Sequence, residues 1–169
     1  MKNAKNIIVL ILIIGIGVFV SKHWKKQDAV STGASETGSK PTNICYIWNT
    51  KAGDSSTLKL STTDGVHVTG TFNYLPAEKD TKTGSVAGVV GELDQATMSQ
   101  TVDLLWTSSA EGMTNIEQLY IKLGEGTAQP AYGEMKLDKV TGHYVYADTN
   151  KLTYGPAMQQ TDCSDPALK

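Results

Sequence analysis

The stretch VHVTGTFNYL, residues 66–75, alternates apolar and polar side chains along its length. Successive side chains of a β-strand point to opposite faces, so this alternation predicts a strand with one buried face. The residues on that face, which we expect to belong to a hydrophobic core, are Val66, Val68, Phe72 and Tyr74.

Short runs of the same kind lie on both sides of this stretch, separated by Gly, Asp, Asn and Pro. They cover residues 45–50, 57–61, 84–93, 101–108, 116–123, 131–137 and 143–147, with a weaker run at 152–154. Further core faces are predicted at Val102, Leu104 and Trp106 and at Leu119, Ile121 and Leu123. The sequence therefore predicts an all-β domain of about eight antiparallel strands, arranged as a small barrel or a sandwich.

Glycine and turn residues support this interpretation. Asp64-Gly65 is a two-residue hairpin signal, and residues 78–84 form a charged connection between two predicted strands. Four glycines inside or beside strands are expected to permit bulges and the coiling that closure of a barrel needs. They are Gly70, Gly84, Gly88 and Gly91.

An uncharged apolar run, IIVLILIIGIGVFV, extends from Ile7 to Val20. Such a run predicts a transmembrane helix or a signal sequence. Residues 18–24 offer no small residues at the spacing that a cleavage site needs, which favours an uncleaved membrane anchor over residues 1–26. A cleaved signal peptide is the alternative.

Residues 27–42, QDAVSTGASETGSKPT, have few large apolar side chains and are predicted to form a flexible linker. The β-domain would then cover residues 43–169, with Cys45 near its start and Cys163 near its end. This placement favours a disulfide, and two separate buried thiols are the alternative. Because a disulfide persists in an oxidising compartment, it would place the domain in the periplasm or outside the cell, with the amino terminus in the cytoplasm.

The charge of the chain is unevenly distributed. Residues 1–42 carry six Lys against two acidic residues, so the net charge of −2 for the whole chain leaves −6 on residues 43–169. An acidic domain gains little from counterion release on a phosphate backbone, which argues against nucleic-acid binding.

Paired carboxylates can hydrolyse glycosidic bonds, and the domain has several candidate acids. They are Glu78, Asp80, Glu111, Glu117 and Glu134. Glu78 and Asp80 flank a lysine in the charged connection, so they are expected to face solvent. Glu111 precedes a glycine after a predicted strand, so it is expected to cap a turn or to contact a ligand.

Tyrosines gather late in the chain, at Tyr132, Tyr144, Tyr146 and Tyr154. They are expected either to pack within strands or to form the base of a binding surface for a sugar or peptide. The candidate binding residues are Glu111, Tyr132, Tyr144 and Tyr146. No metal site or cofactor is predicted, because the histidines His23, His67 and His143 lack zinc-ligand spacing and no phosphate-binding loop, dinucleotide fingerprint or nucleophile elbow occurs.

Three groups of residues together resemble a family of exported bacterial β-domains that are commonly lipoproteins or membrane-anchored proteins. They are residues 69–74 running into 78–80, residues 109–113, and Glu117-Gln118 followed by Gly133-Glu134-Met135. The resemblance covers about residues 45–140; it implies an exported β-fold and brings no assigned activity. The lipidation cysteine is missing here, which gives the predicted anchor more weight. In outline, an anchored and disulfide-tied barrel is also similar to membrane-bound inhibitors of c-type lysozyme.

Taken together, these features favour a membrane-anchored, non-enzymatic binding or inhibitor-like module of the cell envelope. Its partner would be an envelope protein or a glycan. A hydrolase of envelope polymers that uses Glu111 and a second carboxylate is one alternative. A structural or assembly protein is the other.

Overall fold

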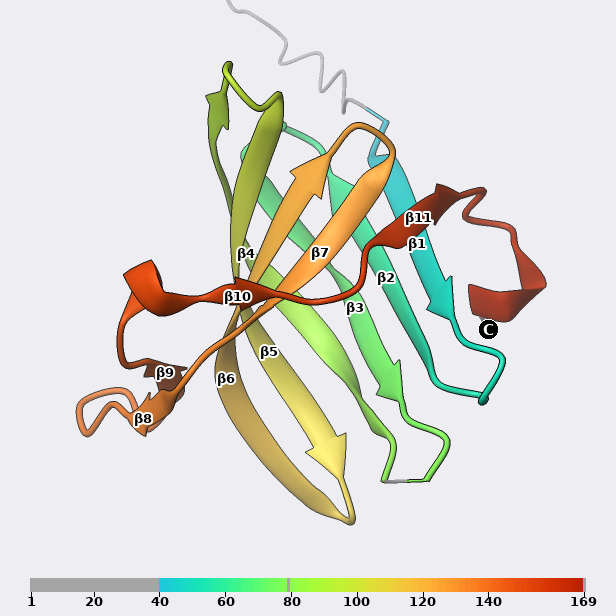
Figure 1. Cartoon of the computed structure of the whole chain (residues 1–169). Coiled ribbons are helices and arrows are strands. Elements are labelled where there is room, and N and C mark those ends of the chain that lie inside the picture. The colour runs from blue at the N-terminus through green and yellow to red at the C-terminus, as the bar shows by residue number, and fades with distance from the viewer. Residues whose placement is uncertain (1–39, 79, 169) are drawn as a thin grey trace, which may run out of the picture. The chain divides into compact units, whose positions relative to one another are not determined.

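The computed structural model describes residues 40–78 and 80–168, and they fold into an all-β domain (Figure 1). Its strands are β1 Thr42–Asn49, β2 Ser55–Thr62, β3 His67–Leu75, β4 Lys82–Asp94, β5 Ser99–Ala110, β6 Met113–Gly124, β7 Thr127–Tyr132, β8 Met135–Leu137, β9 Tyr144–Tyr146, β10 Thr153–Tyr154 and β11 Met158–Thr161. Two short 3₁₀ turns, Thr149–Lys151 and Pro166–Leu168, complete the elements. In this part of the chain, no helix has the length and apolar character needed to cross a membrane. The predicted anchor, Ile7 to Val20, lies outside the described residues.

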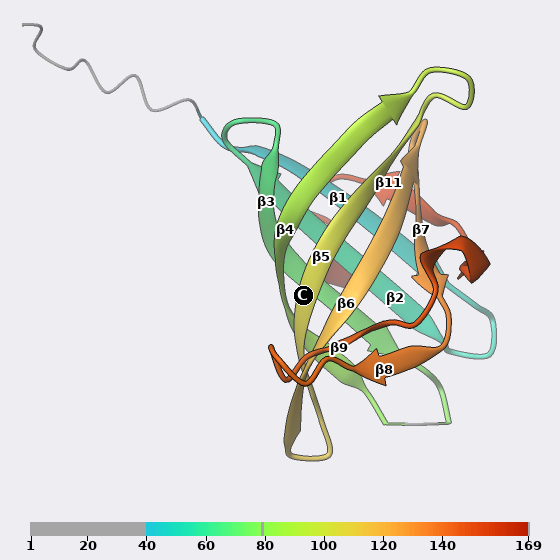
Figure 2. The same cartoon turned by 90° about the vertical axis from the view of Figure 1, so that its left-hand side faces the viewer.

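Eight of the strands close into an antiparallel barrel. Strands β1 to β7 follow one another around the wall, each paired antiparallel with the next. Strand β11 then inserts between β7 and β1 and pairs with both (Figures 1 and 2). The predicted all-β class is confirmed, and the structure is a barrel rather than a sandwich.

The chain between β7 and β11 leaves the wall as an excursion that contains β8, β9 and β10 (orange to red in Figures 1 and 2). Strand β9 pairs in parallel with β6 at Glu117 and Tyr144, and β10 pairs with the end of β7. The predicted single strand over residues 131–137 is therefore wrong. The chain turns away from the wall after Tyr132, and its continuation pairs with β9 instead.

The interior is filled by the side chains that alternation assigns to one face of each strand. The buried cluster contains Tyr46, Leu58, Leu60, Val68, Phe72, Val86, Val102, Leu104, Trp106, Leu119, Ile121, Ala128 and Met158. Tyr74 and Leu123 are partly buried and pack against it. The prediction fails at Val66, which is 50% exposed because it precedes β3 in the loop, where its carbonyl accepts a hydrogen bond from Val90 N–H.

The tightest turns lie at both ends of β6. Ala110 is paired with Met113 across Glu111-Gly112, and φ is +49° at Glu111 and +77° at Gly112. Two central residues with positive φ are typical of the type I′ turn that suits a two-residue hairpin. Glu125-Gly126 joins β6 to β7 in an equally short turn. The predicted two-residue hairpin at Asp64-Gly65 is longer than expected, because β2 ends at Thr62 and β3 begins at His67.

Glycines allow β4 to approach β5 closely. A Cβ at Gly84 or Gly88 would lie 2.0 or 1.9 Å from a backbone carbonyl oxygen of β5. The register between the two strands also shifts between Val90 and Leu93, where Gly91 lies. A bulge is thus confirmed at Gly91 alone, whereas Gly84 and Gly88 lie in regular register and allow close approach of the strands.

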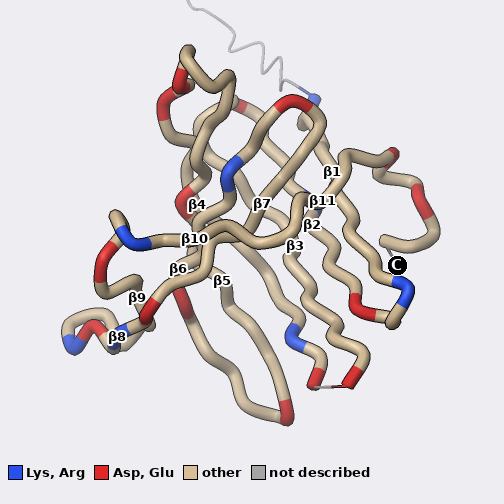
Figure 3. The backbone as a smooth tube through the Cα atoms, viewed as in Figure 1, with Lys and Arg blue, Asp and Glu red and all other residues tan. Residues whose placement is uncertain are grey.

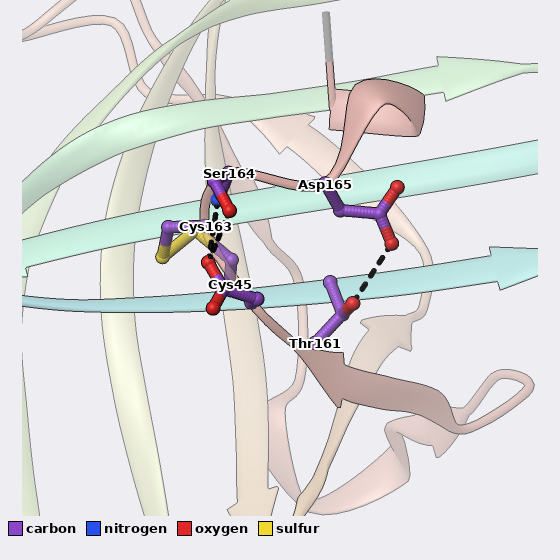
Figure 4. The surroundings of a disulfide bond; sticks show 6 residues. Cys45, Thr161, Cys163, Ser164 and Asp165 are labelled. Atoms are coloured by element: carbon purple, nitrogen blue, oxygen red, sulfur yellow. Dashed lines mark hydrogen bonds between the residues drawn. A yellow bond between two sulfur atoms is a disulfide. The ribbon is translucent and has the colours of Figure 1, made fainter.

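A disulfide joins Cys45 of β1 to Cys163, which follows β11 (Figure 4). Cys45 points to the outer face of β1, opposite the core residue Tyr46, and the disulfide leaves it only 1% exposed. Thr161 Oγ1 also donates to Asp165 Oδ2 at 2.9 Å beside the bond. The predicted pairing is confirmed, and it fixes the closing strand to the first strand.

We expect the double variant Cys45→Ala/Cys163→Ala to lose about 3–5 kcal/mol of unfolding free energy in urea denaturation, because the bond closes a loop with a sequence separation of 118 residues. Wild-type protein with reductant should lose a similar amount. A loss below about 1 kcal/mol in both would show that closure does not depend on the bond.

Candidate functional site

The barrel wall is incomplete on one side, where β6 and β7 separate. Their ladder has four residue pairs and ends at Ile121 and Pro130, whereas β5 and β6 share eleven pairs. Proline has no N–H to continue a ladder. Beyond Pro130, β7 pairs with β10, and β6 contacts β9 at Glu117. This separation leaves a seam at the end of the barrel that carries the β5–β6 turn.

A cavity of about 260 Å³ lies at this seam. Residues of the five wall strands β3 to β7 line it, together with residues of the excursion. The lining residues are Phe72, Tyr74, Lys82, Trp106, Glu117, Gln118, Leu119, Pro130, Ala131, Tyr132, Gly133, Met135 and Tyr146. Five of these side chains are aromatic, and the only charged ones are Lys82 and Glu117. The cavity is therefore an apolar chamber with one ion pair in its wall.

The ion pair joins β4 to β6. Lys82 is the first residue of β4 and Glu117 lies opposite Trp106 in the β5–β6 ladder. Lys82 Nζ binds Glu117 Oε1 and lies 4.7 Å from the ring centroid of Trp106. Ser108 Oγ donates to the same Glu117 oxygen at 3.1 Å. The carboxylate is thus held by a hydroxyl from within the barrel and by an ammonium at the cavity.

Trp106 forms the aromatic wall below this ammonium. Its ring meets Phe72 edge to face, with centroids 4.9 Å apart, and only 5% of the residue is exposed. Its indole Nε1 is buried and has no hydrogen-bond partner among the described residues. A buried donor without a partner costs roughly 1–3 kcal/mol of folding free energy.

Tyr146 closes the outer side of the seam. Its ring stacks on Tyr120 with centroids 5.5 Å apart, its hydroxyl donates to the Ala131 carbonyl at 2.8 Å, and its N–H donates to Gln118 Oε1 at 3.3 Å. Burial of the phenol raises its pKa to about 12. Tyr146 therefore bridges β6 and β7 where their ladder has ended.

Tyr132 and Tyr74 separate the cavity from a smaller one. The second cavity, of about 130 Å³, contains both tyrosines and Pro130 in its wall, with Trp48, Ser56, Pro156 and Met158 on the far side. Tyr132 is 47% exposed, so part of its ring faces solvent at the barrel end. Burial of its hydroxyl, followed by the nearby Tyr74, raises the pKa of Tyr132.

The candidate residues from sequence divide into two groups. Tyr132 and Tyr146 line the cavity, whereas Glu111 lies in the exposed β5–β6 turn and Tyr144 is 43% exposed on β9, outside the lining. The structure thus brings two of the four together. Of the five candidate acids, Glu117 alone lies in the cavity wall; Glu78, Asp80 and Glu134 are exposed.

Lys82 was not predicted as a site residue, and Glu117 was predicted only as one of five candidate acids. The position of Glu117 in the pattern was a usable signal, because it precedes the core residues Leu119 and Ile121 at a spacing of two. A charged residue at an inward position near the end of a strand is a candidate for the mouth of a barrel.

Within residues 40–78 and 80–168, no three metal-ligating side chains come together. His67 Nδ1 instead lies 2.6 Å from Asp64 Oδ2 in the β2–β3 loop. Hydrogen bonds from His67 and from the backbone hold the pKa of Asp64 well below its usual range.

Fold and site together define a class: a small closed antiparallel barrel with an aromatic cavity at one end. No known protein family, curated protein or solved structure matches this chain.

The raised pKa of Tyr146 predicts a loss of stability at alkaline pH. An unfolded tyrosine releases its proton near pH 10, whereas folded Tyr146 keeps it to about 12, so the stability that this group contributes is intact below pH 10 and is lost as pH rises towards 12. Tyr146→Phe should flatten that decline in unfolding free energy. The difference in tyrosinate absorbance between wild type and variant should have its midpoint near pH 12; a midpoint near 10 would contradict the buried hydroxyl.

Proposed function

We propose that this protein is a non-enzymatic binding module of the cell envelope, and that the end cavity receives a small, largely apolar ligand. The observation that carries the proposal is a largely apolar cavity with five aromatic side chains in its wall. Eight-stranded barrels are wide enough to hold one small ligand, and mostly apolar cavities with a few polar groups are the usual ligand sites.

The size of the cavity limits the ligand. A dry cavity of about 150 Å³ accepts benzene, so the 260 Å³ here suits a molecule of one or two rings or a short branched chain. A polymer such as a glycan would have to leave most of its length outside. This favours a small molecule over the envelope protein or glycan expected from sequence.

The composition of the cavity also supports binding rather than hydrolysis. Glycoside hydrolysis in its usual form needs two carboxylates on either side of the bond. Among the described residues of the lining, Glu117 is the only acid, and it is engaged by Lys82 and Ser108. Glu111, the acid named for the hydrolase alternative, lies in a turn outside the cavity.

Binding is tested by filling the cavity. We expect neopentylbenzene to shift the indole N–H resonance of Trp106 in nuclear magnetic resonance spectra, because the ligand would lie against this ring. Met135→Trp adds bulk at the cavity and should weaken binding by about tenfold or more, whereas Met113→Trp, at an exposed position beyond the β5–β6 turn, should not. Equal binding by both variants would contradict the cavity as the site.

We also propose that the β-domain is exported across the plasma membrane. The disulfide supports an oxidising compartment, and the apolar run Ile7 to Val20 with the predicted linker, now ending before Thr42, would tether the domain to the plasma membrane. The domain would then face the periplasm or the cell exterior, with the amino terminus in the cytoplasm.

Protease added to spheroplasts should remove the β-domain while cytoplasmic markers stay intact, and mass spectrometry of the membrane fraction should find the uncleaved amino terminus. Protection of the domain from protease, or full-length protein in the cytosol, would show that it is not exported. A mature form that begins after Val20 would replace the anchor by a cleaved signal.

A further inference from the structure

The ammonium of Lys82 occupies a small cation site inside the cavity. It lies over the face of Trp106, where the ring quadrupole attracts positive charge, and it binds the Glu117 carboxylate. The Lys82 side chain is 29% exposed, and its residue begins β4 after the β3–β4 connection. The lysine head can therefore turn into solvent without breaking the ladder.

Glu117 has a second partner besides Lys82. Its side chain is 19% exposed, and Ser108, which is almost completely buried, donates to Oε1 from the neighbouring strand. A carboxylate at this depth that loses its cation is costly, because the charge is then partly desolvated and unpaired. The carboxylate of Glu117 therefore needs one positive charge beside it, either from Lys82 or from a bound ligand.

The rest of the wall suits the body of an organic cation. Trp106, Phe72, Tyr74, Tyr132 and Tyr146 contribute five rings to the same cavity. Aromatic faces around a carboxylate are the chemistry by which proteins bind alkylated ammonium groups. The apolar part of the ligand would contact the rings and its charged nitrogen would contact Glu117.

The charge balance favours a cation over an anion. A cation that enters exchanges one positive charge for another at Glu117 and releases Lys82 to water. An anion that bound Lys82 would leave Glu117 unpaired and place a like charge beside it. The acidic residues, most of which lie in the connections between strands, add to the same preference (Figure 3). Residues 43–169 carry a net charge of −6.

We propose that the ligand of the end cavity is a small organic cation, whose ammonium replaces that of Lys82 on Glu117 and Trp106. This inference rests on the proposed binding function and names the chemical class of its ligand. It assigns two roles: Glu117 is the counter-ion of the ligand, and Lys82 is an internal competitor for the same place.

The experiment compares three probes of similar size on the full chain in a nonionic detergent. They are benzyltrimethylammonium, its uncharged isostere neopentylbenzene, and the anion phenylacetate. Binding is measured by calorimetry and by the shift of the Trp106 indole resonance. We expect the cation to bind at least about tenfold more tightly than either other probe, because a desolvated cation–π site with a counter-ion adds that much.

Variants separate the two roles. Glu117→Gln keeps the shape of the side chain and should remove the preference for the cation. Lys82→Met keeps the stem but removes the competing ammonium, so it should tighten binding of the cation by several fold. Glu125→Gln removes an exposed carboxylate in the β6–β7 turn and serves as the matched control, with no effect expected.

Each outcome decides between the two proposals. If neopentylbenzene binds as tightly as the cation in wild-type protein, the binding function stands and the cation site is wrong; this comparison needs no variant to fold. If phenylacetate binds best and Lys82→Met abolishes its binding, the site is one for anions. If no probe shifts the Trp106 resonance, the binding function itself fails.

Discussion

The barrel depends on one short strand. Strand β11 fills the gap between β7 and β1 with two register pairs on one side and three on the other. Without it, two sheet edges would expose unpaired N–H and C=O groups, which are both costly to bury and prone to pairing with other chains. Such a short ladder is weak support by itself. The Cys45–Cys163 bond adds a covalent link at the same edge and therefore holds β11 beside β1.

Closure at β11 also positions the seam. Residues 127–130 of β7 pair with β6, and the first two of them also pair with β11. Ala131 and Tyr132 pair with β10 of the excursion instead. Pro130 lies at the point of change, where it cannot donate to β6. The space between the separated strands is the cavity, and Tyr146 spans it from outside through its bond to Ala131. The site is thus a consequence of how the barrel is closed.

Sequence predicted most of the interior because burial on one face imposes a period of two. Val68, Phe72, Leu104 and Ile121 were placed correctly for this reason. Strand β11 was not predicted, since only Met158 of its four residues is buried and no alternation can be seen. The disulfide was predictable because the chain has two cysteines, one at each end of the domain.

The site was less visible than the fold for a physical reason. Tyr132 and Tyr146 were selected because they gather in the sequence, and the fold does bring them to one cavity. Glu111 and Tyr144 belonged to the same prediction, but neither faces the cavity. Glu111 lies in the type I′ turn between β5 and β6, and the side chain of Tyr144 is exposed on β9. Lys82 and Glu117 are 35 residues apart in the sequence. Their pairing becomes visible only from the register of β4, β5 and β6.

The central claim is that β11 closes the barrel between β1 and β7, and through-space nuclear Overhauser effects test it most directly. Antiparallel pairing predicts strong cross-strand effects between Tyr46 and Gln160 and between Ala128 and Met158. Observation of both sets would establish the closed barrel on which the cavity depends. Their absence, with effects between β1 and β2 still present, would mean an open sheet and would contradict the account.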